Sequence, residues 1–131
     1  MGTTDIELMA AAKRLKLKLF KGVFMRNELK KSLKNECGIL NLDSSQNEGT
    51  HWVCWIKNGD EKYYFDSFGI QPPTEIIKYL KSPIMYNTYQ IQQYNDSNCG
   101  EWCLYVLNEY YNGGKKFIDI VLDIVNTNKL Y

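Results

Sequence analysis

One cysteine of the chain, Cys99, has neighbours that would make its thiol reactive. It follows a turn-forming cluster at residues 95–98, and apolar residues then recur at helical spacing, so we expect Cys99 in the first turn of a helix. There the thiol would meet the positive end of the helix macrodipole and free backbone N–H groups, which favour the thiolate. The next residue, Gly100, lets other groups approach the backbone closely. This arrangement is typical of a cysteine nucleophile whose own N–H helps to bind an oxyanion. It equally suits a buried structural cysteine, and we assign Cys103, one turn later, to core packing.

The only histidine, His51, gains a partner from a predicted hairpin. The dipeptide Asn58-Gly59 between two β-prone segments is the strongest short-range hairpin signal. A turn centred on this dipeptide places position 51 opposite Asp66 of the returning strand. A carboxylate beside an imidazole fixes its tautomer and stabilises the imidazolium. A structural histidine and a surface aspartate at a strand end fit the same pattern.

An amide side chain lies shortly before the cysteine. Gln93 is six residues upstream of Cys99, between a predicted strand and the turn. From there it could donate a hydrogen bond to a developing oxyanion. Gln90 and Gln92 are of the same type, so residue type alone does not single out Gln93.

Strands and helices must position these residues. We expect strands at residues 37–42, 51–56, 62–66 and 86–92, because these segments are rich in β-branched and aromatic residues. Helices are expected after a cap at Thr4, with Ile6, Leu8, Met9 and Leu15 as the apolar side, and at 27–34, 74–80, 99–111 and 115–125. Residues 15–20 fit either a helix end or a short strand. The prediction is an α+β fold with a small mixed or antiparallel sheet of about four strands packed against helices.

Composition sets outer limits on function. The chain has 131 residues, 44% of them hydrophobic, which suits a single domain over residues 1–131. No apolar run approaches the roughly 18 residues of a membrane span, and no signal-peptide core is present, so neither membrane insertion nor secretion is expected. The four cysteines are therefore expected to be free thiols. Their spacing contains no CxxC pair, and we expect no metal site.

Charge is distributed unevenly along the chain. Residues 1–36 hold nine Lys or Arg and four Asp or Glu, a net charge of +5, whereas the remainder carries −4. A basic segment of this kind is typical either of a polyanion contact or of a solvated helix face. The candidate DNA-contacting side chains are Lys13, Arg14, Lys16, Lys18 and Lys21.

Three sequence blocks resemble a known family. They are Gly-Thr-His-Trp-Val at 49–53, Tyr-Tyr-Phe-Asp-Ser-Phe-Gly at 63–69 and Gln-Tyr-Asn-Asp-Ser-Asn-Cys-Gly at 93–100. In this order they resemble the adenovirus endopeptidase (adenain) family, and the same order of His, acid, Gln and Cys occurs in the related proteases that remove SUMO-like modifiers. The N-terminal residues 1–8 are also similar, so the likeness runs from about residue 1 to about residue 112.

The resemblance implies a papain-like fold with the nucleophile at the start of a central helix. It makes Cys99 the nucleophile, His51 the general base, Asp66 the orienting acid and Gln93 the side chain of the oxyanion hole. Substrate contacts would come from Trp52, as a wall of the cleft beside the histidine, and from Gly100.

The same resemblance implies a cysteine endopeptidase that matures viruses or virus-like elements. Its substrates would be capsid or core precursor proteins, cut at Gly-Gly or Gly-X-Gly sites in the virion and the infected cell, and the enzyme would be a monomer. Two alternatives stay open: a protease that removes ubiquitin-like modifiers, and a noncatalytic capsid-binding or nucleic-acid-binding module with the same fold.

Departures from the family concern its activators. Adenain is activated by a viral peptide tethered through a cysteine in the strand that leads to the glutamine, and residues 82–92 contain no cysteine. The implied cofactors are therefore DNA or a peptide bound noncovalently, and the chemistry itself requires none. After the catalytic helix this chain is also much shorter, since residues 113–131 supply only one predicted helix.

Overall fold

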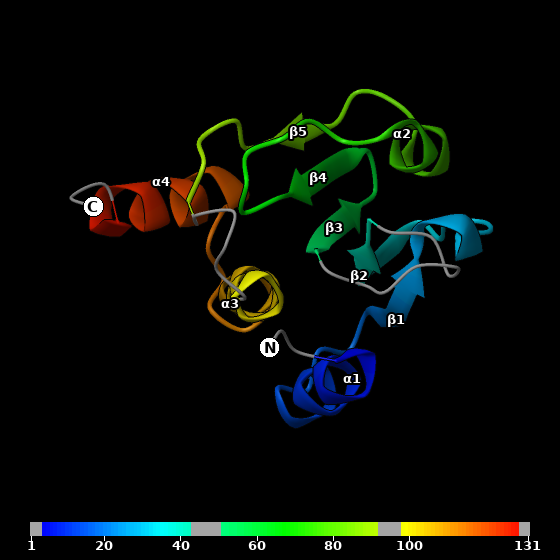
Figure 1. Ribbon diagram of the computed structural model, residues 1–131, viewed down its shortest axis with the longest axis horizontal. Helices are drawn as coiled ribbons and strands as arrows, with labels where there is room; N and C mark the ends of the chain where they lie inside the picture. The colour runs from blue at the N-terminus through cyan, green and yellow to red at the C-terminus, as the bar shows by residue number, and fades with distance from the viewer. Residues whose placement is uncertain (1–3, 43–50, 92–97, 129–131) are drawn as a thin grey trace.

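The protein folds around one five-stranded sheet with the spatial order β1-β2-β3-β4-β5 (Figure 1). The computed structural model describes residues 4–42, 51–91 and 98–128. Strands β1 and β2 pair in parallel, as do β4 and β5, whereas β2, β3 and β4 pair antiparallel. The strands are β1 (Phe20–Met25), β2 (Asn35–Asn41), β3 (Trp52–Asn58), β4 (Glu61–Phe65) and β5 (Met85–Tyr86). The sheet is mixed, as expected, and has one strand more than expected because β1 joins its edge.

Helices cover both faces of the sheet. Figure 1 shows α1 and α3 on one side and α2 on the other. The helices are α1 (Asp5–Arg14), the short 3-10 helix η1 (Arg26–Glu28), α2 (Thr74–Leu80), α3 (Cys99–Tyr111) and α4 (Phe117–Asn128). None of the described helices is long and apolar enough to cross a membrane.

Side-chain alternation along the strands separates two cores. In β3, Cys54 and Ile56 face the helices α1, α3 and α4, whereas Val53 and Trp55 face α2. Successive side chains of a strand point to opposite faces, so both faces of this strand are buried. The first core contains the cysteine that begins α3, and it therefore ties the site to the centre of the molecule.

The expected helices at both ends of the chain are confirmed. Thr4 caps α1 in a capping box, in which its hydroxyl accepts from the Glu7 N–H and the Glu7 carboxylate accepts from the Thr4 N–H. Helix α3 spans the predicted residues. The apolar side expected for α1 is wrong in part, because Leu8 and Ala12 are buried while Ile6 and Met9 are exposed.

Two predicted elements are replaced by irregular chain. A helix at 27–34 does not form beyond η1, because side chains take its backbone groups. The Leu33 N–H donates to the carboxylate of Glu36, three residues further on (2.6 Å), and the Lys31 carbonyl accepts from Lys21 Nζ of β1 (2.6 Å). The strand expected at 86–92 ends at Tyr86, because of contacts of Asn87 that are described with the site below. Gln92 lies outside the described residues.

The hairpin forms two residues away from the predicted register. Strands β3 and β4 pair Asn58 with Glu61 and Cys54 with Phe65, so the turn consists of Gly59 and Asp60. Gly59 adopts a positive φ of 63°, which explains why glycine suits this turn. Continued past the paired residues, this register places position 51 opposite Phe68 rather than Asp66.

The buried carboxylate Glu36 organises the core under α2. Its oxygens accept from Trp55 Nε1 (2.7 Å), the Tyr79 hydroxyl (2.5 Å) and the Leu33 N–H, and Lys21 Nζ lies 3.6 Å away. Four segments distant in sequence therefore meet at one side chain. A buried charge of this kind is tolerated because it is paired and hydrogen-bonded.

Replacing Glu36 with leucine is expected to destabilise the fold. The free energy of unfolding should fall by about 3–5 kcal/mol, because the indole N–H, the phenol and the Leu33 N–H lose their acceptor and the Lys21 ammonium loses its ion-pair partner. Urea denaturation with an unchanged m-value would measure this loss. A matched control is Glu75→Ala, which breaks the exposed pair with Arg26 (2.9 Å) and should cost less than about 1 kcal/mol. Equal losses for the two variants would contradict the assigned role of Glu36.

Candidate active site

The thiol of Cys99 lies at the start of α3, where β3 begins on the neighbouring sheet. The side chain is 3% exposed and belongs to the α3-side core. Its Sγ accepts from the backbone N–H of Trp52 at 3.4 Å, a contact that the sequence did not predict. The free N–H groups of the first helical turn add a positive field at the same place.

The surroundings of Cys99 favour its thiolate. Burial alone would raise the pKa of this thiol. The interaction with His51, the N–H of Trp52 and the N–H of Gly100 outweigh burial and lower the pKa below its ordinary value. A thiol activated in this way differs from a structural core cysteine, whose pKa burial raises.

His51 and Asp66 form the predicted pair. The ring Nε2 of His51 lies 2.6 Å from Oδ1 of Asp66, and the aspartate is fully buried. Burial alone would lower the pKa of His51, but the interactions with Asp66 and Cys99 raise it to about 9. The lowered pKa of Cys99 and the raised pKa of His51 both favour a thiolate beside an imidazolium.

The other ring nitrogen of His51 is free to serve the cysteine. Nδ1 is buried and completes no hydrogen bond among the described residues, while the ring interacts electrostatically with Cys99. Because Nε2 is held by Asp66, Nδ1 is the atom left for exchanging a proton with the thiol or with a leaving group.

Phe68 fixes the plane of the imidazole. The two rings stack with centroids 3.9 Å apart and an interplanar angle of 3°. Strand pairing does not explain the stack, because the β3–β4 pairs end at Cys54 and Phe65 and the chain turns at residues 66–69. Phe68 was not predicted from the sequence as part of the site, because its place depends on this turn.

The Asp-Ser-Phe-Gly segment is a turn built around the carboxylate. Asp66 Oδ1 also accepts from the Phe68 N–H at 2.8 Å, and the Gly69 N–H donates to the Asp66 carbonyl at 2.8 Å. Gly69 has a φ of 73°, and a Cβ there would come within 2.8 Å of the Tyr89 backbone. The turn therefore requires glycine, and it holds the carboxylate oxygen toward the histidine.

Asn87 clamps the backbone of the same aspartate. Its Oδ1 accepts from the Asp66 N–H (3.0 Å), and its Nδ2 donates to the Asp66 carbonyl (2.7 Å). The side-chain amide thus replaces a neighbouring strand's peptide group, which explains why β5 ends at Tyr86. No sequence pattern singled out this residue, since an asparagine amid predicted strand residues has many roles.

Comparisons of whole structures identify the architecture. Solved structures similar to this chain include two of the ASFV pS273R protease. The first has a TM-score of 0.64 and 16% sequence identity, and the match covers 92% of this chain. The second, of the selenomethionine protein, has a TM-score of 0.53 and 20% identity, and the match covers 70% of this chain. The fold is papain-like. This agrees with the expected fold class, and at these identities the likeness concerns the fold.

The match covers only part of the solved structures, and its sequence identity is low. This chain spans 61% of the first matched structure and 39% of the second. No family model and no curated protein matches it. The adenain family is therefore retained as a resemblance.

The remaining candidate residues have different outcomes. Gln93 lies outside the described residues, and the last residue described before it, Ile91, donates its N–H to the Ser67 carbonyl at 2.8 Å. Trp52 is 5% exposed and packs in the same core as Cys99. Its backbone N–H is the group that contacts the thiol. Gly100 is buried in the first turn of α3.

The other three thiols are buried and form no disulfide. Burial raises the pKa of Cys37 to about 12 and raises that of Cys103 above its ordinary value. Within residues 4–42, 51–91 and 98–128, no group of three His, Cys, Asp or Glu side chains could hold a metal ion.

Removing the stacked ring tests its role in orientation. Phe68→Ala should lower kcat by about 10-fold or more, because a misdirected histidine no longer meets the reacting atoms in a productive geometry. Phe68→Tyr keeps the aromatic face and should retain most of the activity. Steady-state kinetics on one cleavable peptide would compare the two, and equal activity of Phe68→Ala and the unmodified protein would exclude a positioning role.

Proposed function

We propose that the protein is a cysteine endopeptidase. One observation carries the proposal: the buried Asp66 holds His51 beside a thiol that begins a helix and has a lowered pKa. A noncatalytic module would not require a buried carboxylate, an oriented imidazole and an activated thiol in one place. The papain-like fold, which the chain shares with the matched protease structures, supports this reading.

The mechanism uses this chain's own groups. The Cys99 thiolate attacks the scissile carbonyl carbon, forming a C–S bond and an oxyanion. The Cys99 N–H and, by resemblance to adenain, the Gln93 amide donate hydrogen bonds to that oxyanion. His51 gives its proton to the amide nitrogen as the C–N bond breaks. It then takes a proton from water, which attacks the acyl-enzyme and releases the thiolate.

We further propose a biological setting from the resemblance and from the matched viral protease. The substrates are capsid or core precursor proteins cut at Gly-Gly or Gly-X-Gly sites, inside infected cells and virions, by a monomeric enzyme. DNA or a noncovalently bound peptide would act as an activator rather than as a chemical cofactor.

Cleavage of defined peptides tests the proposed activity. The protein is incubated with peptides that contain Gly-Gly, Gly-X-Gly or neither, and the cut bond is identified by mass spectrometry. Cleavage after glycine that is absent in Cys99→Ala supports the proposal. A folded ubiquitin-like modifier with a C-terminal extension is tested in parallel; cleavage of this fusion with none of the peptides would favour the deconjugating alternative.

The glutamine near the nucleophile has a separate expected effect. Gln93→Ala should lower kcat by about 10²–10³, the loss expected for one oxyanion donor, with little change in stability. The matched substitutions Gln90→Ala and Gln92→Ala should be nearly silent. Single-turnover rates would distinguish the three, and a loss at Gln92 with none at Gln93 would assign the oxyanion role to Gln92.

A further inference from the structure

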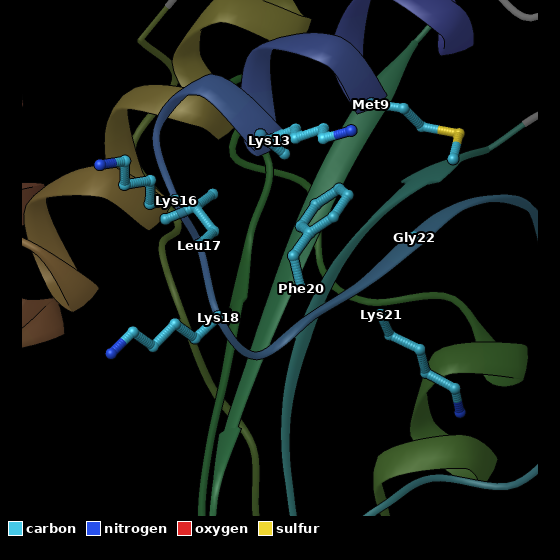
Figure 2. Close-up of a pocket in the computed structure, with 9 residues that line it drawn as sticks. Met9, Lys13, Lys16, Leu17, Lys18, Phe20, Lys21 and Gly22 are labelled. Carbon is cyan, nitrogen blue, oxygen red and sulfur yellow. The ribbon is translucent and has the colours of Figure 1, made fainter.

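A groove between α1 and β1 is lined by both apolar and basic residues (Figure 2). We call it the α1–β1 groove; its volume is about 420 Å³, in the range of ligand-binding clefts. Ala12 and Leu17 are buried beneath it, and Phe20 is half-buried. Met9 is 52% exposed beside them.

Three lysines of the groove carry uncompensated charge. Lys13, Lys16 and Lys18, here called the groove lysines, line it and form no ion pair within the described part of the chain. Lys21 also lines the groove, but its ammonium turns toward α2, where it binds the Tyr79 hydroxyl at 2.8 Å and faces Glu36 (Figure 2). The basic patch expected from the sequence is therefore smaller than predicted, because Lys21 is engaged elsewhere.

Lys16 has a backbone conformation that is uncommon for a residue other than glycine. It follows the C-cap of α1 with a φ of 57°, a left-handed conformation that glycine usually occupies at this point. Favourable contact with the helix dipole explains the basic residues in the last helical turn, and Lys16 adds a further positive charge at this end of α1.

The groove is separate from the candidate active site. The turn after α1 is tied to the C-terminal end of α3, because Asn112 Nδ2 donates to the Leu15 carbonyl at 2.8 Å. Cys99 begins the same helix 13 residues earlier in the chain, and a rise of about 1.5 Å per residue places the two ends about 20 Å apart. A ligand in the groove would therefore not contact the thiol.

We propose that the α1–β1 groove binds an acidic peptide segment of a protein partner. A bulky apolar side chain of the peptide would cover Phe20 and Met9, and flanking carboxylates would face the groove lysines. Charge complementarity selects the carboxylates, and the apolar floor selects the anchor. DNA fits less well, because its contacts are mainly phosphates and these offer nothing apolar to cover the floor.

Fluorescence anisotropy with defined probes tests the proposal. The full chain carrying Cys99→Ala, which prevents cleavage of the probe, is titrated into a fluorescein-labelled peptide Glu-Asp-Leu-Phe-Asp-Glu at low salt. Two matched probes replace either the four acids with their amides or Leu-Phe with Gly-Ser, and a fourth probe is labelled duplex DNA. We expect the first peptide to bind at least about tenfold more tightly than either matched peptide.

Variants locate the contact on the protein. The double reversal Lys13→Glu with Lys18→Glu should weaken peptide binding at least about tenfold, whereas Arg14→Glu, the same charge change on a side chain outside the groove, should have less than about a threefold effect. Met9→Ser should weaken binding several-fold. Lys16→Gly should weaken binding while leaving the urea midpoint unchanged or higher, because glycine relieves the backbone strain.

Three results would overturn the proposal. The first is no saturable peptide binding up to about 1 mM, the weakest range of a specific contact. The second is peptide binding that Arg14→Glu weakens as much as the double reversal does. The third is tight DNA binding that displaces the peptide, which would make the lysines a general polyanion surface. None of these results bears on peptide-bond cleavage, so the proposed protease activity is tested separately.

Discussion

Replacing Cys99 with alanine is expected to abolish peptide-bond cleavage without unfolding the protein. Loss of the nucleophile should lower kcat by a factor on the order of 10⁶, which ordinary assays record as complete loss. The fold should persist, because the substitution removes a single sulfur atom and leaves the helix start intact. The matched control is Cys103→Ala, on the same helix, which should lose some stability but retain activity per folded molecule.

Alkylation distinguishes an activated thiol from buried structural ones. At pH 6, iodoacetamide should modify Cys99 far faster than Cys37 and Cys103, because His51 and two backbone N–H groups lower the Cys99 pKa while burial raises the other two. Peptide mapping of the alkylated protein would give the rate at each cysteine. Slow and equal modification of all the thiols would contradict the activated-cysteine assignment.

The ion pair between the Cys99 thiolate and the His51 imidazolium predicts different pH profiles for cleavage and for alkylation. Cleavage needs a thiolate to attack and a protonated His51 to release the amine, so its rate should decline as the pH rises through about 9, the pKa of His51. Alkylation needs only the thiolate, and its rate should not decline there. Profiles of both rates on one preparation would check the assignment, and a shared decline near pH 9 would point to unfolding instead.

Local sequence signals predicted most of the elements that carry the site. The cap at Thr4, the apolar spacing after Cys99 and the β-prone segment after His51 each depend on neighbouring residues, and all three elements are found. The pairing of His51 with Asp66 was also predicted, although from a hairpin register that is wrong by two residues. It survives because the turn at residues 66–69 folds the carboxylate back toward the ring.

The features that could not be predicted depend on contacts between distant segments. Asn87 ends β5 by bonding the backbone of Asp66, 21 residues away in sequence. Lys21 does not belong to the predicted basic patch, because its ammonium faces the buried Glu36. The irregular chain at 29–34 has a cause of this kind in part, since the Lys31 carbonyl accepts from Lys21, ten residues away in sequence. Residue patterns within one segment carry no information on such partners.

Asp66→Asn should have the second-largest effect on catalysis. An asparagine keeps the shape of the side chain but cannot hold a charged imidazolium, so kcat should fall by about 10⁴. The matched control is Asp60→Asn, the same change at an exposed position of the hairpin turn, which should be silent.

The pH dependence of this variant distinguishes electrostatic support from a structural role. Because Asp66 raises the pKa of His51, its removal should move the decline in cleavage rate from about pH 9 to lower pH, and alkylation of Cys99 at pH 6 should become slower. The stabilising free energy of the pair is fully present below the unfolded histidine pKa of about 6.5 and is lost as the pH rises through about 9, so the difference in unfolding free energy between the two proteins should shrink over that window. A variant with low activity but an unchanged pH profile would show that Asp66 only positions the ring. Full activity with an unchanged profile would remove Asp66 from the mechanism.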